Sequence, residues 1–124
     1  MKILVVDDEH DVQLLFQQRF RKEIKGGTVH FVFAFSGEEA LRTLQEMEHK
    51  AVLILSDINM PGMSGLELLE KIRKDYDKPP PTVMMITAYG DQDNRDTAAR
   101  LGANDFLTKP LEFGILKEKL KAIL

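Results

Sequence analysis

Short apolar runs alternate with longer amphipathic segments along this chain of 124 residues. The runs are rich in β-branched residues and are bounded by polar or turn-forming residues, a pattern typical of strands. They cover residues 3–6, 29–35, 52–55, 83–86 and 105–107. The runs ILVV and VLIL are apolar at every position, which indicates strands buried on both faces of a sheet.

The segments between the runs carry apolar residues at helical spacing. The first predicted helix, residues 11–24, has one apolar face made of Val12, Leu15, Phe16, Phe20 and Ile24. The faces of three further helices are Ala40, Leu41, Leu44 and Met47; Leu66, Leu69, Ile72 and the aliphatic stem of Arg73; and Phe113, Leu116, Leu120 and Ile123. Residues 91–101 form the weakest predicted helix, because Ala98 and Leu101 are its only clear anchors.

Turn and cap signals divide these elements. Ser36 with Glu39, and Ser64 with Glu67, have the spacing of capping boxes that begin helices. Gly62 and Gly65 are both expected to allow a positive φ, and Gly65 also to let the backbone pass close to a neighbour.

A strand followed by a helix, repeated five times, predicts an α/β domain with a doubly wound parallel sheet over residues 1–124. Ligands of such folds bind beyond the carboxyl ends of the strands. The residues at those ends are therefore the first place to look for function.

Composition excludes several classes of function. The chain has no cysteine, so disulfides, thiolate catalysis and cysteine-bound metals are absent, as in a reducing cytoplasm. Seventeen basic and twenty acidic residues give a net charge of −3 with no basic run, which argues against nucleic-acid binding. No apolar stretch approaches the ~20 residues of a membrane span.

Candidate site residues follow four of the five predicted strands, and only the capping Ser36 follows the second. Asp7 and Asp8 follow the first, Asp57 the third, Thr87 the fourth and Lys109 the fifth. Acidic residues are favourable at the start of a helix, where they need have no other role than to cap it. Taken by themselves, Asp7 and Asp8 fit that interpretation. Two carboxylates ~4 Å apart near a surface, however, repel by about 4 kcal/mol. The convergence of three acids with a lysine therefore predicts a cation site.

The order of these motifs resembles the receiver domain of two-component response regulators. The resemblance rests on the DD pair, on LSDINMPGMSG, on ITA and on KP, each after its own strand, and it covers residues 2–124. It implies a flavodoxin-like (βα)5 fold with strand order 2-1-3-4-5.

The resemblance also implies roles for the site residues. Asp57 is expected to be the phosphoacceptor, whose carboxylate forms an acyl phosphate. Asp8, Asp57 and the backbone carbonyl of Asn59 are expected to bind Mg²⁺ directly, with Mn²⁺ as a substitute and with Asp7 acting through a coordinated water. Lys109 and Thr87 are expected to hold the phosphoryl oxygens.

Further positions take their roles from the same family. Thr87 and Phe106 are expected to form a switch in which the ring turns inward, although an aromatic in the last strand is also an ordinary core residue. Asn59 and Tyr89 each lie two residues past a site residue, where the family tunes hydrolysis of the acyl phosphate. The bond before Pro110 is expected to be cis.

The resemblance implies a phosphorylation-activated switch, not an enzyme in the ordinary sense, with intrinsic phosphotransfer and slow self-hydrolysis. The donor is expected to be a histidine kinase or a histidine phosphotransfer protein. The output is expected through residues 91–124, toward an output domain, a partner protein or a second copy of this chain. Because the last helix should finish near Leu124, a stand-alone regulator and a receiver cut from a longer protein both fit.

Three rival functions share parts of this pattern. A magnesium phosphohydrolase with an aspartyl nucleophile needs an acid two residues after Asp57, where this chain has Asn59. A nucleotide or flavin module needs a glycine-rich loop after the first strand, where the acids would repel phosphate. A degenerate receiver that acts only as an interaction module would usually lack Asp57 or Lys109, and both are present.

Overall fold

The computed structural model describes residues 1–47, 53–75, 81–88 and 90–123. Its strands are β1 (Lys2–Val6), β2 (His30–Ala34), β3 (Leu53–Asp57), β4 (Thr82–Ala88) and β5 (Asp105–Lys109). Its helices are α1 (Asp11–Arg19), α2 (Arg21–Lys25), α3 (Gly37–Glu46), α4 (Gly65–Asp75), α5 (Gln92–Arg100) and α6 (Phe113–Ile123).

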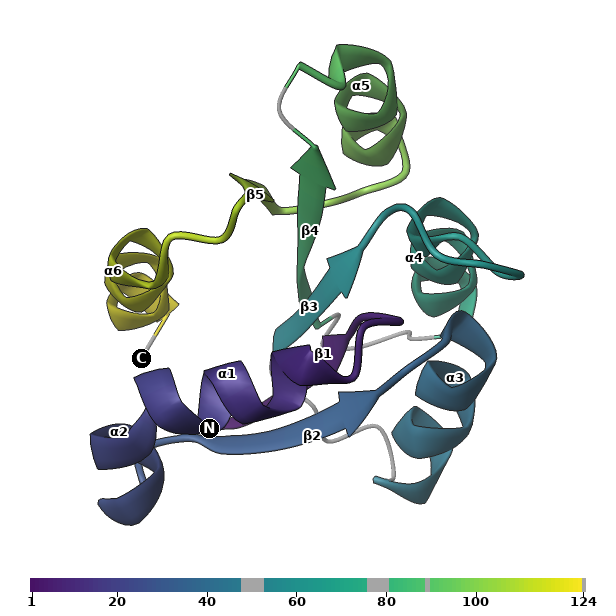
Figure 1. Ribbon diagram of the computed structural model, residues 1–124. Coiled ribbons are helices and arrows are strands. Elements are labelled where there is room, and N and C mark those ends of the chain that lie inside the picture. The colour runs from purple at the N-terminus through teal and green to yellow at the C-terminus, as the bar shows by residue number, and fades with distance from the viewer. Residues whose placement is uncertain (48–52, 76–80, 89, 124) are drawn as a thin grey trace.

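The strands form one parallel sheet in the order β2-β1-β3-β4-β5, which confirms the predicted fold. Helices α1, α2 and α6 cover one face, and α3, α4 and α5 cover the other (Figure 1). None of the helices in the described ranges is long and apolar enough to cross a membrane.

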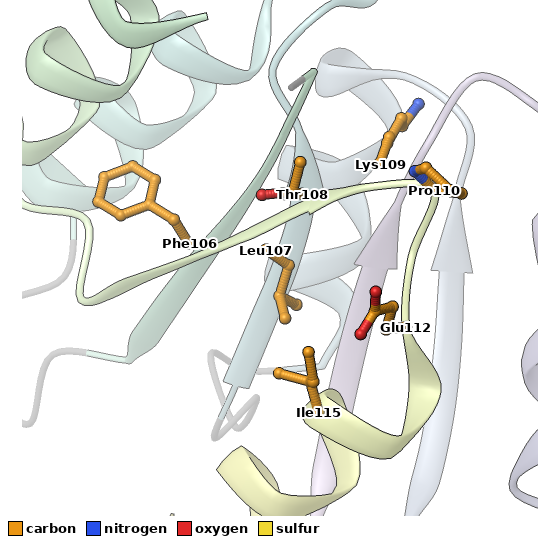
Figure 2. A pocket seen from close by; sticks show the side chains of 7 residues that line it. All are labelled: Phe106, Leu107, Thr108, Lys109, Pro110, Glu112 and Ile115. Atoms are coloured by element: carbon orange, nitrogen blue, oxygen red, sulfur yellow. The ribbon is translucent and has the colours of Figure 1, made fainter. Parts of the chain in front are cut away.

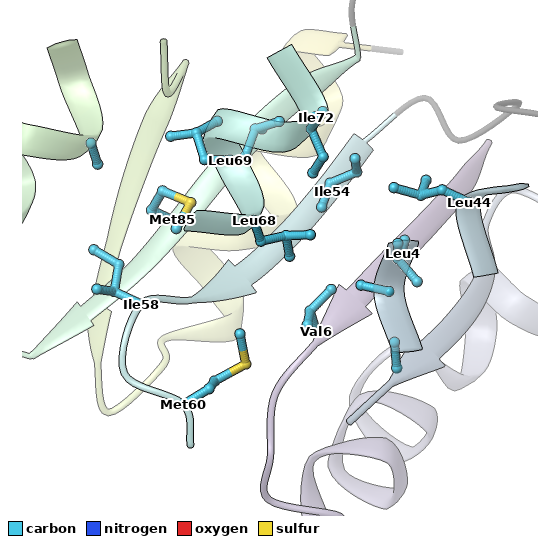
Figure 3. Packing of buried hydrophobic residues seen from close by; sticks show 14 residues of the cluster. Leu4, Val6, Leu44, Ile54, Ile58, Met60, Leu68, Leu69, Ile72 and Met85 are labelled. Atoms are coloured by element: carbon cyan, nitrogen blue, oxygen red, sulfur yellow. The ribbon is translucent and has the colours of Figure 1, made fainter. Parts of the chain in front are cut away.

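Alternate residues of the central strands enter two separate cores, which is why their sequences are apolar throughout. Ile3 and Val5 pack with Phe16, Phe20 and the apolar side of α6. The neighbouring residues Leu4 and Val6 point to the opposite face, where they pack with α3 and α4 (Figure 3).

The helix predicted over residues 11–24 is interrupted at Phe20, whose φ of −107° and ψ of 23° end α1 before α2 begins. The Phe20 ring packs edge-on against Phe31, with ring centroids 5.0 Å apart. Leu15 and Ile24, predicted on the buried face, are 40% and 37% exposed. Packing of the large aromatic rings therefore decides the helix geometry here, and the periodic pattern does not.

Both predicted capping sites are present. The Ser36 hydroxyl accepts the Glu39 N–H (3.0 Å), and the Ser64 hydroxyl accepts the Glu67 N–H (3.2 Å). The carboxylate of Glu39 reaches back to the N–H of Phe35 (3.2 Å), one residue before the cap. These side chains fix where α3 and α4 begin, and α4 follows the loop that leaves the candidate site.

Candidate functional site

Three predicted site residues belong to strands and do not follow them, because the strands extend further than the apolar runs. Asp57 ends β3 and pairs with Ile86 of β4. Thr87 lies inside β4, and Lys109 ends β5. The ladder bonds of a buried sheet thus hold their backbones rigidly at one edge.

An acidic cluster lies at this edge. Carboxylate oxygens of Asp7, Asp8 and Asp57 all lie within 4.8 Å of one another. Asp7 is only 5% exposed and Asp57 only 3%, whereas Asp8 is more open. Burial raises the pKa of the Asp7 carboxyl, although the N–H of Glu9 (2.9 Å) and the Lys109 ammonium act to lower it.

Lys109 is the cation of this edge. Its ammonium donates to Oδ2 of Asp57 and lies 3.8 Å from Oδ2 of Asp7. Partial burial acts to lower the Lys109 pKa, but the hydrogen bond and the charge of Asp57 outweigh it and raise that pKa. The peptide bond between Lys109 and Pro110 is cis.

The cluster fits a divalent cation. Three carboxylates face one ammonium, which leaves surplus negative charge at a partly open site. An all-oxygen donor set of this kind suits Mg²⁺. Asp7, Asp8 and Asp57 would hold the ion.

Thr87 carries an unused hydroxyl. Its side chain is 1% exposed, and Oγ1 has no hydrogen-bond partner among the residues that the structure describes. A buried hydroxyl without a partner costs about 1–3 kcal/mol. Because Thr87 lies next to the residue that pairs with Asp57, the hydroxyl can serve a group that arrives at this edge.

The backbone after β3 turns tightly around the phosphoacceptor candidate. The N–H of Asn59 donates to Oδ1 of Asp57 (3.2 Å), while the N–H of Gly65 donates to the carbonyl of Ile58 (2.8 Å). Gly62 has a φ of 73°, as expected, but Gly65 is not among the glycines with positive φ. Gly65 is needed for another reason, since a Cβ there would lie 2.1 Å from the carbonyl oxygen of Asp57.

Phe106 is half-buried and packs against the edge of the core on the face covered by α3, α4 and α5. Its ring points toward α5 (Figure 2), where the guanidinium carbon of Arg95 lies 4.9 Å from the ring centroid. No local pattern predicts this contact, because Arg95 and Phe106 belong to different elements. Tyr89, predicted to tune hydrolysis, lies outside the described residues.

A cavity of about 430 Å³ lies beside the site, on the side of β5 that faces α6 (Figure 2). Its lining residues are Phe106, Leu107, Thr108, Lys109, Pro110, Glu112 and Ile115. Of these residues, only Lys109 also belongs to the candidate site formed with Asp7, Asp8 and Asp57. The cavity therefore flanks the site and does not contain it.

Comparison with known sequences points to one family. The sequence profile of the response regulator receiver domain matches residues 3–121. The probable transcriptional regulator ycf27 of Cyanophora paradoxa is 37% identical over 99% of this chain and 48% of its own length. A chemotaxis protein CheY homolog of Campylobacter jejuni is 36% identical over 100% of this chain and 92% of its own length. The chain thus spans about half the length of the ycf27 relatives and nearly all of the CheY relatives.

Solved structures agree with this fold. A putative response regulator from Chloroflexus aurantiacus has a TM-score of 0.83 and 30% identity, and the match covers 98% of this chain and 95% of that one. The chemotaxis protein CheY4 of Vibrio cholerae also has a TM-score of 0.83, with 25% identity over 99% of this chain and 98% of that one.

Proposed function

Because the chain belongs to the response regulator receiver domain family of two-component systems, we propose that it is a switch that accepts a phosphoryl group on Asp57. The observation that carries the proposal is the pairing of a buried Asp57 with Lys109 beside surplus acid. This carboxylate is oriented by the N–H of Asn59 and lies close to a cation. Those are the properties that a nucleophile for phosphoryl transfer needs.

The side chains have distinct parts in the proposed transfer. A carboxylate oxygen of Asp57 forms a bond to phosphorus, and the bond from phosphorus to the donor breaks, with its electron pair leaving on the donor. Lys109 pairs with Asp57 at rest and can then turn its ammonium to the new phosphoryl oxygens. The hydroxyl of Thr87, which has no partner within the described part of the chain, can donate to the same oxygens. A bound Mg²⁺ would neutralise charge on the phosphoryl group.

Labelling by a small donor tests this function together with its metal requirement. Acetyl phosphate with Mg²⁺ is expected to add one phosphate, located on Asp57 by peptide mass spectrometry. Excess chelator is expected to lower the labelling rate at least tenfold, because like charge would otherwise face the incoming phosphoryl group. Equal labelling with and without chelator would contradict the role of the metal, and phosphate on another residue would contradict the acceptor.

The proposed physiological donor is a histidine kinase or a histidine phosphotransfer protein. The proposed output surface is made of α5, β5 and α6, where Ala98 is the single buried residue of α5. A thinly anchored helix is a plausible moving part, since mobile elements come from the less stable end of a structure. Movement of Thr87 toward a phosphoryl group would leave space for Phe106 to turn inward and reshape this surface.

Arg95 is expected to stabilise the resting position of Phe106. A cation–π contact near the surface contributes about 0.5–1 kcal/mol, so Arg95→Ala should shift the Phe106 equilibrium inward by about two- to fivefold. Amide NMR with Mg²⁺ and subsaturating beryllofluoride, a phosphoryl mimic, should show residues 90–123 further toward the activated shifts than in the wild type. Arg100→Ala, which removes the same charge from the same helix, should change nothing. An equal shift in both variants would mean that net charge is the cause.

A further inference from the structure

The loop between β3 and α4 rests on the first turn of α3. At its tip the N–H of Met63 donates to Oε1 of Glu38 (3.1 Å). A Cβ on Gly62 would lie 3.3 Å from the same oxygen. A Cβ on Gly37 would lie within 2.8–2.9 Å of three side-chain atoms of Met63. The tip is therefore in close contact with Gly37 and Glu38 through both backbone and side chain.

The same loop carries a predicted metal ligand. Ile58 and Met60 are buried in the core and hold its first half, as Figure 3 shows. Asn59 lies between them, is exposed, and donates its N–H to Asp57. The second half of the loop passes through Met63 at the tip and ends where α4 begins. The contact with Glu38 thus adds to two other contacts of this second half, the packing of the Met63 side chain against the core and the hydrogen bond from the N–H of Gly65 to the carbonyl of Ile58.

The Glu38 carboxylate is suited to this role although it is exposed. The backbone N–H groups of Glu38 and Met63 lower its pKa, with smaller help from Ser36 and Arg42. A hydrogen bond to an ionised acceptor is about twice as strong as one between neutral groups. The contact joins residues 25 apart in sequence, so no local pattern reveals it.

We propose that Glu38 is a positioning residue of the phosphorylation site. By holding the loop tip against α3, it adds to the core contacts of Ile58 and Met60 in fixing the backbone at Asn59, and so raises the affinity of the acidic cluster for Mg²⁺. Glu38 acts through the loop, since its carboxylate accepts from the N–H of Met63, which is not a predicted metal ligand. This inference rests on the proposed function, because it assigns Glu38 to the same site.

The test is a Mg²⁺ titration without any phosphoryl donor, followed through the amide signals of Asp57 and Asn59. Glu38→Ala is expected to raise the dissociation constant about three- to tenfold, the loss expected for one charge-assisted hydrogen bond that supports a ligand. Glu38→Gln keeps an acceptor oxygen and should stay within about twofold of the wild type. The matched control is Glu46→Ala, an exposed glutamate about 12 Å further along the same helix, which should not differ from the wild type.

Labelling by acetyl phosphate separates positioning from loss of fold. At saturating Mg²⁺ the Glu38→Ala chain should be labelled at the wild-type rate, and only the Mg²⁺ concentration for half-maximal rate should rise. If Glu38→Ala lowers the thermal unfolding midpoint too far to measure, Gly37→Ala offers a second route, because its Cβ would push Met63 away and leave Glu38 in place. Gly37→Ala should raise the dissociation constant as well.

An unchanged dissociation constant in Glu38→Ala would overturn the proposal. An equal rise in Glu38→Gln or Glu46→Ala would also overturn it, since charge alone would then be the cause. If the wild type binds Mg²⁺ but accepts no phosphate, the proposed function fails. A weaker Mg²⁺ affinity of Glu38→Ala would still support the positioning role in that case.

Discussion

Asp57→Asn is expected to abolish labelling by acetyl phosphate while leaving the fold intact. An amide has nearly the shape of the carboxylate but is not a nucleophile. The substitution also removes one of the three acids of the cluster, so Mg²⁺ affinity should fall at least tenfold. Intact mass spectrometry measures the first effect.

Thermal unfolding with and without Mg²⁺ measures the second effect. A ligand at 100 times its dissociation constant stabilises a fold by about 2.7 kcal/mol, and a tenfold loss of affinity removes about 1.4 kcal/mol of that. Asp11→Asn is the matched control, because it removes an exposed carboxylate from the first turn of α1 without touching the cluster. Wild-type labelling of the Asp57→Asn chain would show that another residue accepts the phosphate.

Among substitutions that add one methyl group near the site, Gly65→Ala is expected to be the most destabilising. The new Cβ would lie 2.1 Å from the carbonyl oxygen of Asp57 and 2.8 Å from Cα of Ile58. Both are backbone atoms, so no flexible side chain can move aside. We expect a loss of about 3 kcal/mol or more in the free energy of unfolding. Labelling should fall sharply, because relief of the clash moves Asp57 itself.

Gly114→Ala provides the comparison for this prediction. Gly114 also lies in the first turn of a helix, α6, but nothing lies within 4 Å of a Cβ built there. The change should therefore stabilise the chain by about 0.5–1 kcal/mol, as a glycine replaced inside a helix does. Urea unfolding of both variants gives the two values. A Gly65→Ala chain as stable as the wild type would mean that the turn after β3 can relax.

Much of the candidate site could be predicted because a parallel sheet brings the carboxyl ends of its strands together. That rule alone predicts that Asp7, Asp57 and Lys109 lie at one edge of the sheet. Their proximity in the structure agrees with it. The strand ends were predicted too early, however. The last residues of β3 and β5 are polar, so the apolar runs stop before the hydrogen-bonded strand pairing does. These residues are Ser56, Asp57, Thr108 and Lys109.

Other features depend on residues that are far apart in sequence. Arg73 was predicted only to bury its aliphatic stem, but its guanidinium donates to the carbonyls of Pro81 (2.8 Å) and Gly102 (2.7 Å). The contact of Arg95 with Phe106 and that of Glu38 with Met63 are of the same kind. No periodicity marks such pairs, because each depends on how two elements pack.

The amino-acid sequence is enough to predict the alternation of strands and helices, the doubly wound sheet and the edge of the sheet where the polar site residues lie. These follow from local propensity and from hydrophobic period, which act within a few residues of each other. Three features depend on tertiary packing: the break at Phe20, the burial of the Thr87 hydroxyl without a partner among the described residues, and the contact of the loop tip with Glu38. Those depend on how large side chains share space and on which polar atoms find partners, and both are settled only when distant segments pack together.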